Sequence, residues 1–137
     1  MKNTMKILFL IVFLFTAKNF FAESKVDIKE VKSTLTKLFD LCKNKNYKDA
    51  SLYLAYTGKD GIKRFNYSEK SDKKIVKRKC KKIKAYLELS DAYEYGKFSS
   101  VGNKGNIEII FKSGDQEFNI VFSFIKLGTK ILLLNFK

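Results

Sequence analysis

The last third of the chain is a series of short apolar segments separated by turn signals, and this pattern restricts the fold more than any other. The apolar segments occupy residues 92–101, 107–111, 117–127 and 131–136. Glycine-containing turns separate them at 102–106, 113–115 and 128–130, and glycine supplies the positive backbone torsions that tight turns need. The pattern predicts four consecutive antiparallel strands.

Alternation within these segments indicates which face of the sheet is buried. Phenylalanine and isoleucine take every second position from Phe118 to Phe124, and isoleucine and phenylalanine do so from Ile107 to Phe111. Alternate residues of a strand share one face. The segment 131–136 is apolar on both faces, which is typical of a strand that is central or covered. We therefore expect one face of the sheet to be fully buried and the other partly buried.

Three amphipathic helices are predicted before the strands, at about residues 27–43, 47–56 and 72–89. Asp27 and Asn46 stand at positions suited to capping the first two helices, and Gly58 can end the second. Residues 58–69 are polar and less regular, and they fit either a short strand or an anchored loop. The order of elements predicts an α+β fold, with the three helices packed on a curved four-stranded antiparallel sheet.

The first 22 residues predict an export signal. Lys2 and Lys6 precede a run of nine apolar residues at 7–15, and Ala22 is the expected last residue before cleavage. The run is too short to span a bilayer, which takes about 20 residues. We therefore expect an exported protein, periplasmic or secreted, whose mature chain is one domain, residues 23–137, without a transmembrane span.

The strongest local charge feature is the basic run at residues 70–84, which spans most of the third predicted helix. The chain has 28 Lys and Arg residues against 14 Asp and Glu, a net charge of +14, and much of the excess gathers here. A basic helix can bind anionic lipid, nucleic acid or acidic polysaccharide. The alternative is a helix that packs its apolar stripe on the sheet and leaves its lysines solvated. The anion-binding candidates are Lys74, Lys77, Arg78, Lys81 and Lys82.

Cys42 and Cys80 are the two cysteines of the chain, and both lie on apolar faces of predicted helices. An exported protein meets oxidising conditions, in which a disulfide between them is allowed. The alternative is a pair of buried free thiols, which pack as small hydrophobic side chains.

The composition excludes several common kinds of catalytic and metal site. The chain has no histidine, which removes the usual general base and the usual metal ligand. Two distant cysteines make no zinc motif. We therefore expect no cofactor and no metal site, and we assign no catalytic residue. An enzyme that uses a carboxylate in a cavity is the remaining alternative, and the spacing of Asp40, Asp49, Glu88 and Asp91 does not pair any two of them.

The segments 39–51 and 125–136 resemble parts of small exported bacterial members of the nuclear transport factor 2-like, or cystatin-like, α+β roll superfamily. In those proteins a first helix ends and a second begins as Tyr47 and Ala50 suggest here, and a closing hairpin turns as Gly128 to Lys130 does. The resemblance covers about residues 27–137 and implies a cone-shaped roll. The superfamily includes both enzymes and non-catalytic binding domains. The catalytic members use Asp or His inside the cone, and no residue of this chain matches such a position.

These observations predict an exported, non-catalytic binding or accessory domain for a small apolar ligand or a protein partner. A pocket is expected between the third helix and the concave face of the sheet, unless the same aromatic side chains simply fill the core. Its candidate residues are Phe65, Tyr86, Tyr93, Phe111 and Phe122.

A homodimer through the sheet is also expected, because three helices can cover only one face of four strands. The alternative is strong curvature, which lets the C-terminal strands wrap both faces around one core. The expected dimer patch consists of Val121, Ile125, Leu132, Leu134 and Phe136.

Overall fold

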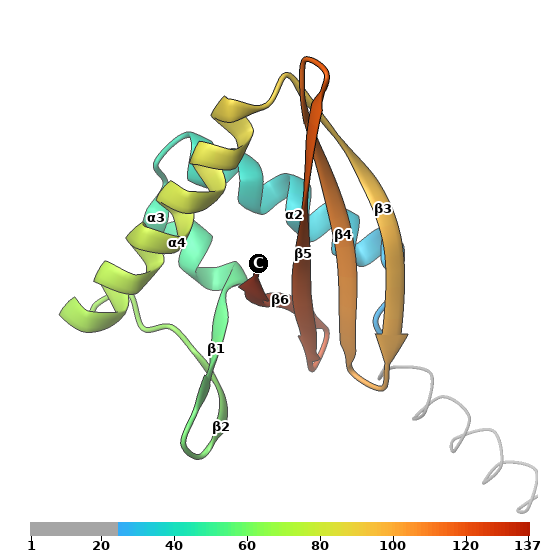
Figure 1. Ribbon diagram of the computed structural model, residues 1–137. Helices are drawn as coiled ribbons and strands as arrows, with labels where there is room; N and C mark the ends of the chain where they lie inside the picture. Colours follow the sequence, from blue (N-terminus) through green and yellow to red (C-terminus); the bar gives the residue numbers. More distant parts are fainter. Residues whose placement is uncertain (1–24) are drawn as a thin grey trace, which may run out of the picture.

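The computed structural model describes residues 25–137, and the predicted export signal lies outside them. Figure 1 shows the two long helices beside a twisted sheet, with a small hairpin projecting next to them. The helical elements are α2 (Ile28–Lys43), α3 (Tyr47–Ala50), the 3₁₀ turn η1 (Ser51–Tyr53) and α4 (Lys70–Leu89). The strands are β1 (Ala55–Gly58), β2 (Gly61–Arg64), β3 (Ala92–Val101), β4 (Lys104–Ser113), β5 (Gln116–Leu127) and β6 (Lys130–Phe136).

The four C-terminal strands form one antiparallel sheet in the order β3-β4-β5-β6, which confirms the predicted α+β class and the predicted meander. Gly102, Gly114 and Gly128 have positive φ angles of 59°, 58° and 64° in its three turns. The pairing register shifts between Tyr95 and Phe98 and again beside Ser123. Such irregularities bend strands, and here they curve the sheet around its core.

The two long helices were predicted closely. The Asp27 side chain accepts a hydrogen bond from the backbone N–H of Lys29 at 3.3 Å and so caps α2. Helix α4 begins two residues before the predicted start and ends at the predicted residue, Leu89. Cys42 of α2 and Cys80 of α4 form a disulfide, with their Cα atoms 4.8 Å apart. The disulfide therefore joins the last turn of α2 to the middle of α4.

The prediction of a second helix through residue 56 is wrong beyond its first turn. Helix α3 ends at Ala50, and after η1 the chain becomes extended. Leu54 pairs in parallel with Leu133 of β6, and β1 begins at the next residue. Leu54 and Ala55 are both fully buried, in different apolar clusters. An extended chain points successive side chains in opposite directions and can bury both in this way, whereas a helix turns them only about 100° apart.

Residues 58–69, expected to be a short strand or an anchored loop, include β2, which pairs with β1 in an antiparallel hairpin. The hairpin lies beside β6 and covers part of the second face of the sheet. Beneath it Ala55, Ile125 and Leu132 form a small apolar cluster, with Ile62 packed against them.

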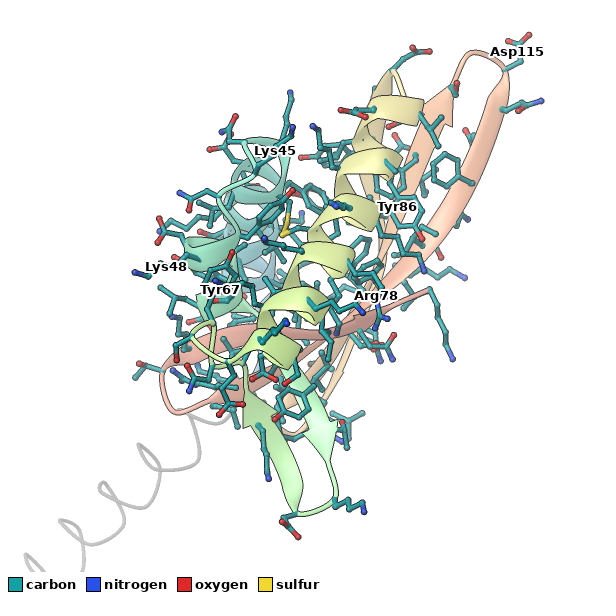
Figure 2. All side chains as sticks on the ribbon, turned by 90° about the vertical axis from the view of Figure 1, so that its left-hand side faces the viewer. Lys45, Lys48, Tyr67, Arg78, Tyr86 and Asp115 are labelled. Atoms are coloured by element: carbon teal, nitrogen blue, oxygen red, sulfur yellow. A yellow bond between two sulfur atoms is a disulfide. The ribbon has the colours of Figure 1, made fainter. Side chains whose placement is uncertain are left out.

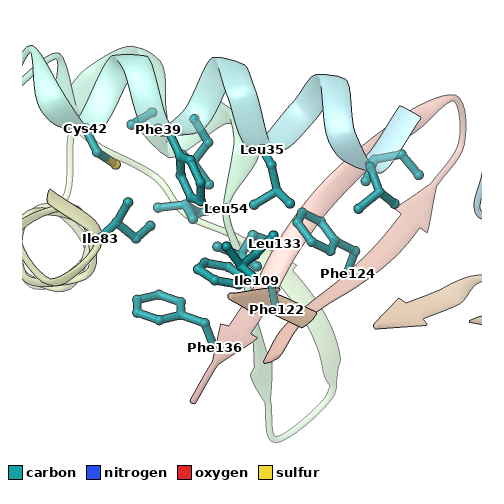
Figure 3. Packing of buried hydrophobic residues seen from close by; sticks show 14 of the residues in the cluster. Leu35, Phe39, Cys42, Leu54, Ile83, Ile109, Phe122, Phe124, Leu133 and Phe136 are labelled. Carbon is teal, nitrogen blue, oxygen red and sulfur yellow. The ribbon is translucent and has the colours of Figure 1, made fainter. Parts of the chain in front are cut away.

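The main core lies between the long helices and the first face of the sheet. Figure 3 shows Leu35 and Phe39 of α2 and Ile83 of α4 directed toward side chains of the strands. Phe122 and Phe136 stack in this core, with ring centroids 5.3 Å apart. The remaining residues shown there include Ile109, Phe124 and Leu133, and all of them are buried.

The expected dimer patch is therefore not an exposed patch. Ile125 and Leu132 are 3% and 0% exposed because the β1–β2 hairpin covers them. Phe136 is buried in the main core, and Leu134 is half-buried. Only Val121 is clearly exposed, at 40%. The alternative, in which the C-terminal strands wrap both faces around one core, does not describe this part of the sheet either, because Ile125 and Leu132 lie in a second apolar cluster with Ala55 of the hairpin.

Candidate anion-binding surface and cleft

Helix α4 separates an apolar side from a cationic side. Val76, Cys80 and Ile83 are its fully buried residues and contribute to the main core. The five anion-binding candidates project away from that core, and we call them the basic face. Four of them are exposed and one, Lys77, is half-buried. The basic face consists of Lys74, Lys77, Arg78, Lys81 and Lys82.

The charges of the basic face are not neutralised within the described part of the chain. None of the five ion pairs found among residues 25–137 includes a residue of the basic face. The single ion pair on α4 joins Lys84 to Glu88, at 3.5 Å. The helix therefore presents cationic groups whose counterions must come from solvent or from a binding partner.

Aromatic rings support several lysines of α4. The ammonium group of Lys73 lies 5.1 Å from the ring centroid of Tyr67, and that of Lys77 lies 5.9 Å from the ring of Tyr47. Figure 2 shows α4 with Tyr67 and Lys48 on one side of it and Arg78 on the other. The rings attract the ammonium groups themselves, and neither lysine forms an ion pair within residues 25–137.

On the Arg78 side, a groove of about 310 Å³ lies between α4 and the end of β6. The α4–β6 groove is lined by Arg78, Lys79, Lys82, Asn135 and Phe136. The Lys79 ammonium group donates a hydrogen bond to the Leu134 carbonyl at 3.2 Å and lies 5.5 Å from the Phe65 ring centroid. Burial lowers the pKa of Lys79, and the neighbouring Arg78 charge lowers this pKa further.

Lys79 was part of the basic run in the sequence but was not chosen as a candidate residue. Its position is informative, because it follows Val76 by three residues and precedes Ile83 by four. That spacing places it at the margin of the apolar stripe, where a lysine stem can be buried.

Four of the five candidates for an apolar pocket lie together in one aromatic group. The Phe111 ring centroid is 5.6 Å from that of Tyr86 and 6.0 Å from that of Tyr93, and Phe39 joins Tyr93 to Phe122. Phe111 and Phe122 are 0% exposed, and they fill the core. The fifth candidate, Phe65, packs elsewhere, against Tyr56 of β1, with the two ring centroids 4.7 Å apart.

Tyr93 also lines an open cleft of about 980 Å³ between α2 and the junction of α4 with β3. Phe39 and Leu87 supply apolar surface beside Tyr93, and hydroxyl, lysine and carboxylate groups line the remainder. Burial raises the pKa of Tyr93, and Tyr95 raises it further. The lining residues are Ser33, Thr36, Lys37, Phe39, Asp40, Lys43, Leu87, Glu88, Ser90, Asp91, Ala92 and Tyr93.

The cleft brings together three of the four carboxylates considered in the sequence. Asp91 accepts a hydrogen bond from the Gly114 N–H at 2.9 Å, and Glu88 pairs with Lys84. Asp40 is the third, while Asp49 lies apart and contacts Asn46. Within residues 25–137 no three His, Cys, Asp or Glu residues are grouped closely enough to hold a metal ion.

The order of elements and the curved, open sheet define an α+β roll. Among solved structures, the chain is similar to a de novo designed NTF2-fold protein, NT-9, with a TM-score of 0.54 and 13% sequence identity. That match covers 82% of this chain and 87% of the designed one.

A second match is a de novo designed protein with a curved β-sheet, with a TM-score of 0.45 and 14% identity over 80% of this chain and 87% of the other. No protein-family model matches the sequence, and no curated protein matches it. The likeness to the first designed protein shows the fold alone. No helix of residues 25–137 combines the length and the apolar character that crossing a membrane takes.

Proposed function

We propose that the protein is a binding domain whose partner is a polyanion, held along the basic face of α4. The observation that carries this proposal is the set of five unpaired cationic side chains on one side of a single, firmly anchored helix. The disulfide and the buried residues Val76 and Ile83 fix the helix against the rest of the fold. A rigid array of charges loses little entropy when it binds.

Electrostatic attachment fits this surface better than insertion into a membrane. An interfacial helix buries its apolar face among lipids. The apolar side of α4 is already occupied, because Val76, Cys80 and Ile83 are buried in the core. The remaining side offers charge and the stems of lysines, which suits a solvated anionic polymer.

The test compares two variants that lose the same charge. In the first, the five residues of the basic face are replaced by glutamine. In the second, five exposed lysines elsewhere, which form no ion pair and contact no ring, are replaced in the same way. These control residues are Lys25, Lys29, Lys59, Lys97 and Lys104.

We expect the first variant to leave heparin–agarose at much lower salt than the control variant, because retention depends on phosphate- or sulfate-like charges contacted by fixed cations. Anionic vesicles and single-stranded DNA as further probes identify the kind of polyanion. Equal elution of the two variants would show that net charge alone causes retention, and this outcome contradicts the proposal.

The cleft beside Tyr93 favours a second candidate function, binding of a small apolar ligand. Its volume of about 980 Å³ lies within the range of ligand sites, about 300–1,000 Å³, and Phe39, Leu87 and Tyr93 give it an apolar surface. We expect the neutral dye Nile red to fluoresce on binding, and Leu87→Gln to weaken this signal several-fold. Val101→Gln, which alters an apolar side chain 84% exposed and outside the cleft, is the control. Equal dye binding by both variants excludes the cleft.

Export from the cell is part of the proposal, and the disulfide supports it, because disulfides persist in oxidising compartments. The sequence predicts a cleavage site near Ala22, and a small exported bacterial roll remains the expected type of protein. Mass measurement of the protein recovered outside the cytoplasm should find a chain that begins near Glu23. Recovery of the full-length chain from the cytosol contradicts export.

A further inference from the structure

The α4–β6 groove differs from the rest of the basic helix because its cations converge. Elsewhere on the helix the lysines have separate surroundings: Lys73 and Lys77 lie over different rings, and Lys84 pairs with Glu88. Here Arg78, Lys79 and Lys82 line one concave site of about 310 Å³, together with Asn135 and Phe136. None of the three cations has a carboxylate partner among residues 25–137, and no carboxylate lines the groove.

The ends of two of these side chains are held by contacts that leave donors free. Lys79 uses one N–H group on the Leu134 carbonyl, at 3.2 Å, and an ammonium group has three. The rings of Phe65 and Phe136 lie 5.5 Å from the ammonium groups of Lys79 and Lys82. Because contacts already hold these two lysines, their side chains lose little further conformational entropy when an anion binds in the groove.

The remaining donors suit an oxyanion with several acceptor atoms. Arg78 carries five N–H donors in a planar fork that matches phosphate, and the Asn135 amide can donate two more hydrogen bonds. Three unneutralised cations favour a doubly charged group over a singly charged one, because Coulomb attraction grows with the charge of the ligand.

From this arrangement we propose that the α4–β6 groove binds a phosphate monoester group, in its doubly charged form, carried on a larger anionic molecule. Phosphate monoesters have a second pKa of about 6 and carry close to two charges at neutral pH, whereas a diester carries one. The inference rests on the proposed function, because the groove shares Arg78 and Lys82 with the basic face. It adds that the partner has a terminal phosphate group and that Lys79 binds it.

The test measures binding of two small probes, methyl phosphate and dimethyl phosphate, by NMR titration at constant ionic strength. We expect methyl phosphate to shift the amide signals of residues 78–82 and 135, and to bind about tenfold more tightly than dimethyl phosphate. Equal binding of the two probes, or no methyl phosphate binding at tens of millimolar, overturns the proposal.

Two matched variants locate the binding in the groove. Lys79→Met removes the charge that lies over Phe65 and keeps an unbranched side chain, and we expect it to weaken methyl phosphate binding about tenfold. Lys70→Met removes the same charge from an exposed position at the start of α4, outside both the groove and the basic face, and should change binding less than twofold. Lys79→Arg should restore most of the affinity. Equal losses for Lys79→Met and Lys70→Met overturn the proposal.

Thermal unfolding checks that the variants are folded, and Lys82→Gln provides a second groove variant where Lys79→Met is unstable. Failure of the inference is distinguishable from failure of the proposed function. If the wild-type protein is retained on heparin through the basic face but binds the two probes equally, only the inference fails. If retention does not depend on the basic face, the proposed function fails, and the probe titration still decides the groove.

Discussion

Among single residues, the position of a lysine relative to the apolar stripe of α4 decides its role. Lys74 and Lys81 are exposed and contribute charge to the surface. Lys79, on the same helix, lies at the edge of the stripe, contacts the Leu134 carbonyl and has a lowered pKa, chiefly because of burial. A run of basic residues therefore contains exposed lysines and a lysine at the margin of the apolar stripe, and the packing of α4 against β6 gives the second kind its contacts.

The disulfide gives the first prediction at this scale. Cys42 and Cys80 are separated by 38 residues, and the chain-entropy relation for a closed loop of this length gives about 4 kcal/mol of stabilisation. We expect Cys42→Ala combined with Cys80→Ala to lower the free energy of unfolding by about 3–4 kcal/mol in urea titrations. A reducing agent should have a similar effect on the wild-type protein and none on the double variant. An unchanged urea midpoint after reduction of the wild-type protein contradicts this prediction.

At the scale of elements, sequence patterns predicted the helices and strands that depend on interactions between residues close in the chain. Alternation and glycine turns identified the four strands, and capping and periodicity identified α2 and α4. The end of α3 could not be predicted in this way. Residues after Ala50 carry no strong strand signal, and their conformation depends on the pairing of Leu54 with Leu133, a residue far along the chain. Such tertiary contacts override weak helix propensity.

The candidate site likewise has one part that the sequence predicts and another part that depends on contacts between distant segments. The basic face could be read from the sequence, because its residues are close together on one helix. The α4–β6 groove could not, because Asn135 and Phe136 reach it only through the course of β6. The apolar pocket was expected from a row of aromatic residues, yet alternation cannot tell a cavity lining from a filled core, and Phe111 and Phe122 are fully buried.

At the scale of the whole molecule, the two faces of the sheet are covered by different parts of the chain. The long helices cover the first face. On the second face, the β1–β2 hairpin covers the part formed by Ile125 and Leu132. The remainder carries polar pairs between neighbouring strands. The Ser123 hydroxyl donates to the Asn106 side-chain oxygen at 2.7 Å, and Lys112 pairs with Glu94 at 3.1 Å.

This distribution leads to a prediction about association. The exposed valines of this face, Val101 and Val121, stand on different strands among cross-strand polar pairs. Such a face is typical of a solvated antiparallel sheet and offers little apolar area for a stable dimer. We therefore expect the mature chain to sediment as a monomer at micromolar concentration. Val121→Lys changes the exposed residue of the expected dimer patch. It should leave the sedimentation coefficient unchanged and change the free energy of unfolding by no more than about 0.5 kcal/mol.

Leu132→Lys is the matched substitution on the covered part of the same face. Leu132 is fully buried beneath the hairpin, so the lysine places an unpaired charge among Ala55, Ile62 and Ile125. We expect this variant to lose at least about 3 kcal/mol of stability, measured by urea unfolding, because a buried charge without a partner is strongly unfavourable. If the protein sediments as a dimer that Val121→Lys dissociates, the outer face of the sheet is an interface after all. If Leu132→Lys is as stable as the wild-type protein, the hairpin does not cover this residue in solution.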